Sequence, residues 1–522
     1  MANQSINKKH EYSTSDFDGV NTQALRQAIK PGQQAWLENI QPVGPANAKI
    51  VPGISAQLAQ LTGGVTPYYA QGFNITISGT PTDLIFVAST DGNIWSINLS
   101  TYAVTAITLG TANAGKFTQC SAAQWKNERL MIIDSVTGLW DWDGTTLNNT
   151  VGYTSRPSSG TCIATFSNIV WVANNRTISY SAFNSYQNFS VAAGNNGGST
   201  ILSDETLHSS IQQLISSNNF LYVFGIDSVN VFSDARASAA GNPIFTNTNL
   251  STGVGTGFPM SCTTYGRSVW FASANGFYGL YGASARKEST ELDGMYDQIL
   301  NINNPALVGA APTISAGLVT INQILCVAFL FTYQDTDGNR PLLAVYFDKK
   351  WFFVGKTAIT SNSNPNLIVD CPVKGQNKLF SFDSSGRFYQ LFSSDSNVEF
   401  QWKTALWDFQ QPIQYKQATK VGVGVYFGAA VSTIDALIDT ESSSNTVSPP
   451  LSVSGSMTFV GSGPITFVGT GPITFLSAGY VLLQSDATNW GRYVGVTLNG
   501  NASNLTFTLM MMEYNYRSQW GT

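Results

Sequence analysis

Charged residues are scarce in this sequence. Asp, Glu, Lys and Arg make up 11% of the 522 residues, against about 25% in an average globular protein. The net charge is only -5, and no stretch gathers Lys and Arg into a cluster. Tight binding of nucleic acid through its phosphates needs such a cluster, so the composition argues against a basic binding groove. Because hydrophobic residues reach 43%, a large folded core is expected.

Histidine and cysteine are equally rare. The two histidines, His10 and His208, supply almost no material for a Ser-His-Asp triad or a histidine metal cluster. The cysteines are odd in number, widely spaced and mostly set in apolar stretches, which favours buried free thiols over disulfides or metal ligands. They are Cys120, Cys162, Cys262, Cys326 and Cys371.

Long apolar runs are also missing. The longest, Ile324–Tyr333, is far too short to cross a bilayer as a helix. The N-terminal stretch MANQSINKKHEYSTSDFDG contains no apolar core of a signal peptide, so synthesis in the cytoplasm is predicted. Residues 1–19 are polar and aperiodic, and we expect an arm that orders only against a partner, or not at all.

A repeated hairpin pattern organises most of the chain. In Gly266–Ser289 an apolar run reaches a Ser-Ala-Asn-Gly break, where positive φ is tolerated, and an aromatic run follows. This pattern predicts a β-hairpin. It recurs around Leu84, Leu130, Ile169, Leu221, Leu325 and Leu379. Intervals of about 40 to 55 residues indicate β-propeller blades. We predict six or seven, because the first or last blade can be a composite of strands from both ends.

The pattern changes near Phe400. Lys420–Gly428, KVGVGVYFG, alternates strictly and predicts a strand with its valines on one face. We therefore predict an all-β chain in three parts: an N-terminal arm and extended segment (1–53), the propeller (54–399), and a separate C-terminal β-rich, sandwich-like domain (400–522). Short helices are expected only over residues 24–29 and 291–307.

The carboxylate pairs are the only candidates for hydrolytic chemistry. Asp141 with Asp143, Asp335 with Asp337, and Asp91 all fall near expected hairpin turns. Asp is favoured at turns because its side chain accepts hydrogen bonds from nearby backbone amides. We therefore predict structural roles for them, with no catalytic residue, no cofactor and no metal site.

Several stretches resemble a known family, the tail nozzle or packaged-DNA stabilisation (tail hub) proteins of short-tailed bacteriophages. The resemblance rests on AWLENIQPVGPANAKIVPGI (Ala35–Ile54), on TISYSAFNSYQNFS (Thr177–Ser190), and on SVWFASANGFYGLYG (Ser268–Gly282) leading to Asp293. The endings WGRYVGVTLNGN (Trp490–Asn501) and EYNYRSQW (Glu513–Trp520) are also similar.

The resemblance implies a non-enzymatic structural protein of the virion tail, made in the host cytoplasm during head-tail assembly. It would form a homo-oligomer, most simply a hexamer, beneath the portal-adaptor ring. It would retain packaged double-stranded DNA without sequence-specific binding and form the channel for genome ejection. Tail fibres or spikes, and the host cell surface, are further implied partners. A weakly acidic chain suits a channel that must not hold DNA.

One repeat has no counterpart in that family. Ser456–Gly479 contains TFVG-x-GPI segments at an eight-residue period. We expect these segments to lie at the distal tip, where Phe459, Phe467 and Phe475 from several copies would narrow the channel. The alternative is an ordinary β-meander.

Two other functions stay open from the sequence. One is a glycan-binding or glycan-cleaving propeller of a tail protein, since abundant aromatics can stack on sugars. The other is a generic structural or interaction propeller without a channel.

Overall fold

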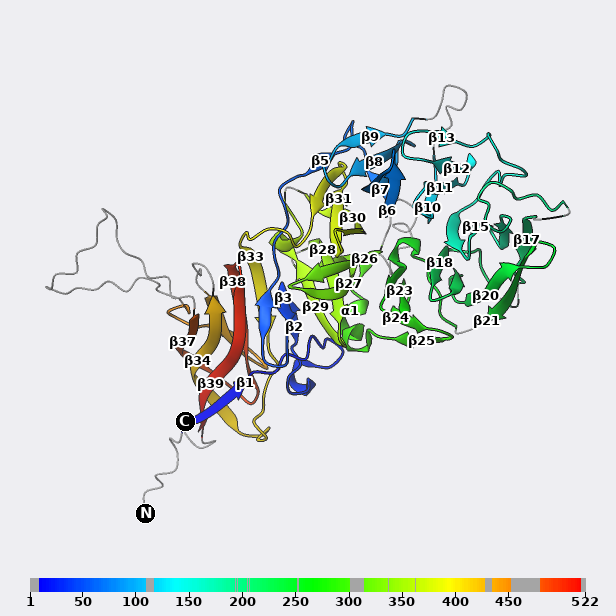
Figure 1. Cartoon of the computed structure of the whole chain (residues 1–522). Coiled ribbons are helices and arrows are strands. Elements are labelled where there is room, and N and C mark those ends of the chain that lie inside the picture. The colour runs from blue at the N-terminus through cyan, green and yellow to red at the C-terminus, as the bar shows by residue number, and fades with distance from the viewer. Residues whose placement is uncertain are drawn as a thin grey trace, which may run out of the picture. The chain divides into compact units, whose positions relative to one another are not determined.

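The computed structural model describes the following residues: 9–108, 117–192, 194, 196–203, 205, 207–250, 253–300, 314–336, 338–361, 363–427, 434–451 and 479–517. The chain forms two compact units (Figure 1). Unit 1 contains residues 1–54, 346–359 and 392–522, and unit 2 contains residues 55–345 and 360–391. This division differs from the expected boundaries at residues 53 and 399, because the N-terminal segment and residues 346–359 group with the C-terminal residues.

Unit 2 is a β-propeller built from antiparallel sheets (Figure 1). Blade 1 contains β6 (Pro67–Ile77), β7 (Thr80–Ser89), β8 (Ile94–Asn98) and β9 (Val104–Ala106). Blade 2 contains β10 (Cys120–Trp125), β11 (Arg129–Asp134), β12 (Gly138–Trp142) and β13 (Leu147–Asn148). Blade 3 contains β14 (Cys162–Phe166), β15 (Ile169–Asn174), β16 (Thr177–Tyr180) and β17 (Gly198–Ile201). Blade 4 contains β18 (Gln213–Ser217), β19 (Phe220–Phe224), β20 (Val229–Ala237) and β21 (Pro243–Asn249). Blade 5 contains β22 (Thr263–Tyr265), β23 (Ser268–Ser273), β24 (Gly276–Tyr281) and β25 (Ser284–Lys287). Blade 6 contains β26 (Ser315–Ile321), β27 (Ile324–Asp335) and β28 (Gly338–Phe347), followed in the same sheet by β29 (Lys350–Gly355). Blade 7 contains β30 (Pro365–Val373), β31 (Gln376–Asp383), β32 (Arg387–Gln390) and β5 (Ala59–Gln60).

The expected hairpins are the second and third strands of each blade. In blade 5, β23 and β24 pair from Val269 opposite Leu280 to Ser273 opposite Gly276. Gly276 has a φ of 148°, a backbone conformation that would be strained in a residue with a side chain. The described chain has seven blades, so the upper of the two expected counts is confirmed.

Blade 7 closes the ring as a composite. Its outermost strand is β5, from the beginning of unit 2, and β5 pairs with β32 at Gln60 opposite Arg387. A core cluster holds blades 7 and 1 together, with Phe380 and Phe382 packed against Ile85 and Val87. Burying each such side chain stabilises the fold by about 1.5 to 3 kcal/mol. The composite blade expected from the sequence is therefore the last one.

Unit 1 contains two sheets. The first has the strand order β3 (Ile40–Pro42), β4 (Ala48–Ile50), β39 (Leu505–Arg517), β34 (Tyr415–Phe427), β37 (Gly479–Gly491), with β1 (His10–Thr14) also pairing with β39. The second has the order β29 (Lys350–Gly355), β2 (Trp36–Glu38), β33 (Val398–Lys403), β38 (Val494–Ala502), β35 (Ile434–Thr440), β36 (Ser444–Thr446).

These two sheets pack face to face. Phe507 of β39 lies 5.4 Å from the ring of Phe400 and 5.5 Å from that of Trp402, both on β33. Val421 and Val423 of β34 are fully buried, as their alternation predicted. Unit 1 is therefore sandwich-like, but its core also uses residues from the N-terminal segment.

Two local expectations differ from the structure, and two more concern neighbouring segments. In the arm, residues 10–14 form β1 on β39 of the same chain, so a partner is not needed to order them. The helix expected at 24–29 is only a 3-10 turn, Arg26–Ala28, which Pro31 and Gly32 cut short. Within the helix expected over 291–307, the described residues form the end of the 3-10 turn Thr290–Leu292 and one turn of α-helix, α1 (Asp293–Tyr296), and residues 301–307 lie outside the described part. The run Trp351–Val354 lies in β29, which follows β26, β27 and β28 in the strand order of one sheet, as expected for a third run of blade 6.

Three further points complete the fold. Two other 3-10 turns span Pro259–Ser261 and Lys356–Ala358. Among the described residues, no helix is long and apolar enough to span a membrane. Phe459, Phe467 and Phe475, with the whole Gly-Pro-Ile repeat, lie outside the described residues, so their expected place at a channel tip stays a prediction.

Candidate functional site

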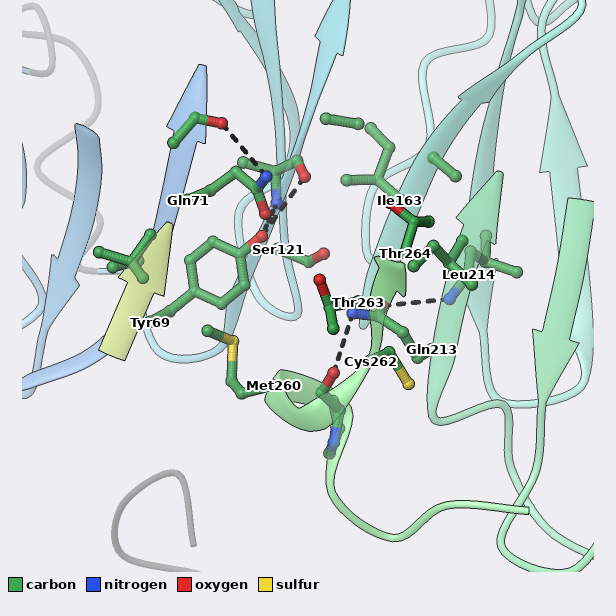
Figure 2. Close-up of a pocket in the computed structure, with 18 of the residues that line it drawn as sticks. Tyr69, Gln71, Ser121, Ile163, Gln213, Leu214, Met260, Cys262, Thr263 and Thr264 are labelled. Atoms are coloured by element: carbon green, nitrogen blue, oxygen red, sulfur yellow. Dashed lines mark hydrogen bonds between the residues drawn. The ribbon is translucent and has the colours of Figure 1, made fainter. Parts of the chain in front are cut away.

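A central cavity is lined by the innermost strands of the seven blades of unit 2, and Figure 2 shows part of its wall. It has a volume of about 330 Å³, at the lower end of the range for small-molecule sites. Each blade contributes residues from its first strand: β6, β10, β14, β18, β22, β26 or β30. The cavity therefore belongs to the propeller alone.

Small residues let these inner strands approach one another. A Cβ added to Gly72 of blade 1 would lie 2.2 Å from the carbonyl oxygen of Asp370 in blade 7. One added to Gly317 of blade 6 would lie 2.7 Å from Leu379 and 3.2 Å from the Asp370 carboxylate. Real Cβ atoms do not approach backbone this closely, so glycine is required at Gly72 for ring closure.

Polar side chains brace the wall of the central cavity (Figure 2). The Tyr69 hydroxyl accepts a hydrogen bond from the Ala122 amide at 2.8 Å and donates to the Ala122 carbonyl at 3.3 Å, which joins blades 1 and 2. Gln213 of blade 4 donates to the Pro259 carbonyl, which precedes β22 in blade 5, at 3.2 Å. Because both partners in each pair are fixed in the wall, the cavity is held by hydrogen bonds across neighbouring blades.

Asp370 is the one carboxylate among the described residues that line the cavity. Burial raises the pKa of Asp370 to about 6, and the Leu318 backbone amide only partly opposes this shift. Burial also raises the pKa of Tyr69 to about 12 and that of Cys262 well above its usual value. At neutral pH both stay uncharged, and no Lys, Arg or His lines the described cavity.

The carboxylates singled out in the sequence lie elsewhere. Asp91 and Asp143 accept hydrogen bonds from turn amides, as predicted; for example, the Thr146 amide donates to Asp143 at 2.7 Å. Asp335 pairs with Arg340 at 2.9 Å, and Asp337 lies outside the described residues.

For Asp141 the turn assignment was wrong. Asp141 lies within strand β12, fully buried, opposite Met131. Its carboxylate accepts from Arg129 at 2.6 Å and from Asn148 at 2.9 Å. Burial raises the pKa of Asp141 despite the Arg129 charge. It is thus a buried, paired group that holds blade 2 together.

The other chemical candidates are also structural. All five cysteines are free, and four of them are buried. His208 forms a surface pair with Asp227 at 3.1 Å. In the described part of the chain, no three His, Cys, Asp or Glu side chains gather in a geometry that could hold a metal ion.

The stretch Ala35–Ile54 connects separate segments of unit 1 through one buried side chain. Asn39 is fully buried with a φ of 61°, a conformation that Asn tolerates better than most residues. Its side-chain amide donates to the carbonyls of Gly355 at 2.9 Å and Glu399 at 2.6 Å, and its side-chain oxygen accepts from the Gly355 amide at 2.9 Å. A single side chain thus connects three distant segments.

Asp370 was missed by sequence reasoning, as were the inner strands. The signal was present but weak: a short stretch rich in small residues precedes several of the expected hairpins, as in Ser121-Ala122-Ala123 before Arg129. Small residues alone do not distinguish an axial strand from a loop.

Comparisons with known proteins do not identify a family for this chain. No family model matches the sequence, and no curated protein sequence matches it. Among solved structures, two crystal structures of the extracellular domain of BT4673 from B. thetaiotaomicron are 10% and 11% identical, with TM-scores of 0.42 and 0.41. They match 73% and 78% of this chain, which spans only 45% and 46% of that domain's length. The computationally designed Ika8 protein is 13% identical with a TM-score of 0.35, over 65% of this chain and 100% of Ika8. The propeller assignment rests on the strand pairing described above.

Proposed function

We propose that this chain is a structural protein of a short-tailed phage virion, a tail nozzle or tail hub subunit. In this proposal it forms a homo-hexamer below the portal-adaptor ring, retains the packaged DNA and forms the ejection channel, with tail fibres or spikes attached. The observation that carries the proposal is the resemblance of Ala35–Ile54, Thr177–Ser190 and Ser268–Gly282 to that family.

The structural use of these stretches supports this reading. Asn39, in the first stretch, connects β2, β29 and β33. In the second, the Ser181 hydroxyl accepts from the Val170 amide at 2.9 Å, and Phe189 packs between blades 2 and 3. Residues placed this way maintain a scaffold, which is what a tube component requires.

The charges of the chain also support a structural role over a glycan-cleaving one. Glycoside cleavage commonly uses two carboxyl groups flanking one bond, whereas Asp370 is the one carboxylate on the described cavity wall. The low density of Lys and Arg also suits a wall past which DNA slides, because few phosphates would be neutralised.

The decisive experiment is the mass of the assembly taken from virions. Tails are detached from purified particles and measured by size-exclusion chromatography with light scattering, followed by negative-stain microscopy. A hexamer of the 56.2 kDa chain gives about 337 kDa and a hollow six-fold ring. A monomer or dimer extracted under the same conditions contradicts the proposal, and so does absence of the chain from the particles.

Genome retention provides the second readout. Particles assembled without this chain are expected to fill with DNA and then lose it, which nuclease sensitivity of the packaged DNA measures. Particles that lack the chain yet keep nuclease-resistant DNA rule out a role in retention. Release of sugar from host polysaccharide by the purified chain would instead support the glycan-cleaving alternative.

A further inference from the structure

We propose that the central cavity of the propeller is a binding site for a small organic ammonium compound, with Asp370 as its anionic anchor. The inference goes beyond the proposed tail function and does not depend on it.

The electrostatics of the cavity select a cation. Asp370 lines a wall without Lys, Arg or His, and the partner that its carboxylate has is a neutral one, the Leu318 backbone amide. The two other ionisable groups on the wall, Tyr69 and Cys262, are held neutral by burial, which raises the pKa of each. An anion would gain nothing here, whereas a cation would relieve the unfavourable burial of the carboxylate.

The coordination chemistry favours an organic cation over a metal ion. A tightly held divalent metal needs several anionic or closely spaced oxygen ligands, and this wall offers one carboxylate. An ammonium group carries three N–H donors and is satisfied by one carboxylate and two neutral acceptors. Thr263 and Thr264, neighbours on β22, both line the cavity and supply neutral oxygen acceptors to its wall.

The size and access of the cavity suit a ligand of monosaccharide scale. About 330 Å³ is many times the space that one water needs. Gln71 and Ser216, both on the wall, are exposed, so solvent reaches the cavity. The bracing hydrogen bonds from Tyr69 and Gln213 keep the wall in place before a ligand arrives, which lowers the ordering cost of binding.

The test uses three sugars of matched shape and the full-length chain. Saturation-transfer NMR at pH 7.0 measures binding of glucosamine, which is cationic, and of glucose and N-acetylglucosamine, which are neutral. We expect a signal for glucosamine and none for the neutral pair. Asp370→Asn preserves the side-chain shape and should weaken glucosamine binding by at least about tenfold, since it removes a charge-assisted hydrogen bond.

The matched control is Asp234→Asn, which removes an exposed carboxylate of the same propeller that is paired with Arg236 at 2.9 Å. This control should bind glucosamine like the wild type. The proposal is overturned if the three sugars bind equally, if Asp370→Asn binds glucosamine as the wild type does, or if glucosamine gives no signal. Circular dichroism of both variants establishes that a lost signal does not come from unfolding.

Discussion

Removing the charge of Asp370 should stabilise the ligand-free propeller at neutral pH and above. The carboxylate is ionised there, but it lies in a cavity wall without a cationic partner. Asp370→Asn keeps the shape and the polarity of the side chain while removing the charge. We therefore expect the variant to unfold at a higher temperature than the wild type.

The magnitude follows from the shift in pKa. Folding raises the pKa of Asp370 from 3.8 to about 6, and a shift of this size corresponds to about 3 kcal/mol. Because water reaches the cavity, we reduce this to about 1 to 2 kcal/mol. For a unit of this size that is about 2 °C in melting temperature.

The sign of the pH dependence is fixed by the direction of the shift. A raised pKa means that the folded state holds the Asp370 proton more tightly than the unfolded state does. The resulting stability is fully present below about pH 4 and is lost as the pH rises through about 6. The titratable groups beside Asp370 do not interfere, because burial raises the pKa of both Cys371 and Tyr69 to about 12.

The assay is thermal unfolding of both proteins between pH 4 and 8, followed by circular dichroism at constant ionic strength. The variant should be more stable at pH 8, and the two curves should converge near pH 4. A variant less stable than the wild type at pH 8 refutes the reasoning, as does a difference that does not shrink on acidification.

Three further substitutions test other parts of the fold. Asn39→Ala should destabilise unit 1 by about 3 kcal/mol or more in urea titrations, because three buried groups lose partners. A loss of stability under about 1 kcal/mol contradicts the inferred role of Asn39 in connecting the three segments. Asp141→Ala should lower stability by about 2 kcal/mol, since it removes the buried acceptor of both Arg129 and Asn148, and Asp143→Ala by under about 1 kcal/mol. Gly72→Ala should largely abolish soluble expression, because its Cβ would clash with the Asp370 carbonyl. The control Gly79→Ala has open space around it but a φ of 82°, so it should lower the stability of the fold by only about 1 kcal/mol.

The sequence predicted the blade hairpins well because their signal is local. Alternating apolar strands around a turn such as Asn275-Gly276 need no distant partner to be recognised. Strand pairing across long separations carries no such signal. That β5 pairs with β32, or that Trp36 lies opposite Lys403, depends on which edges remain open after the rest has folded.

Charge and burial explain the misjudged and missed residues. Asp141 follows Trp140 in a Trp-Asp-Trp-Asp-Gly sequence typical of a turn, and its place inside β12 depends on Arg129 arriving from the neighbouring strand. Asp370 stands between Val369 and Cys371 with no motif around it. Its environment is created by seven strands that only the closed ring brings together.

The composite blade also determines when the propeller can close during translation. Gln60 emerges from the ribosome about 330 residues before Arg387, its partner in blade 7, which is roughly 15 to 65 seconds at ordinary synthesis rates. In unit 1 the delay is even longer, because Lys49 of β4 pairs with Thr506 of β39. Until then the first strands have no place to dock, and both sheets expose open edges that recruit other chains. A ribosome that stops early therefore releases a chain with neither unit closed, a natural target for chaperones and proteases.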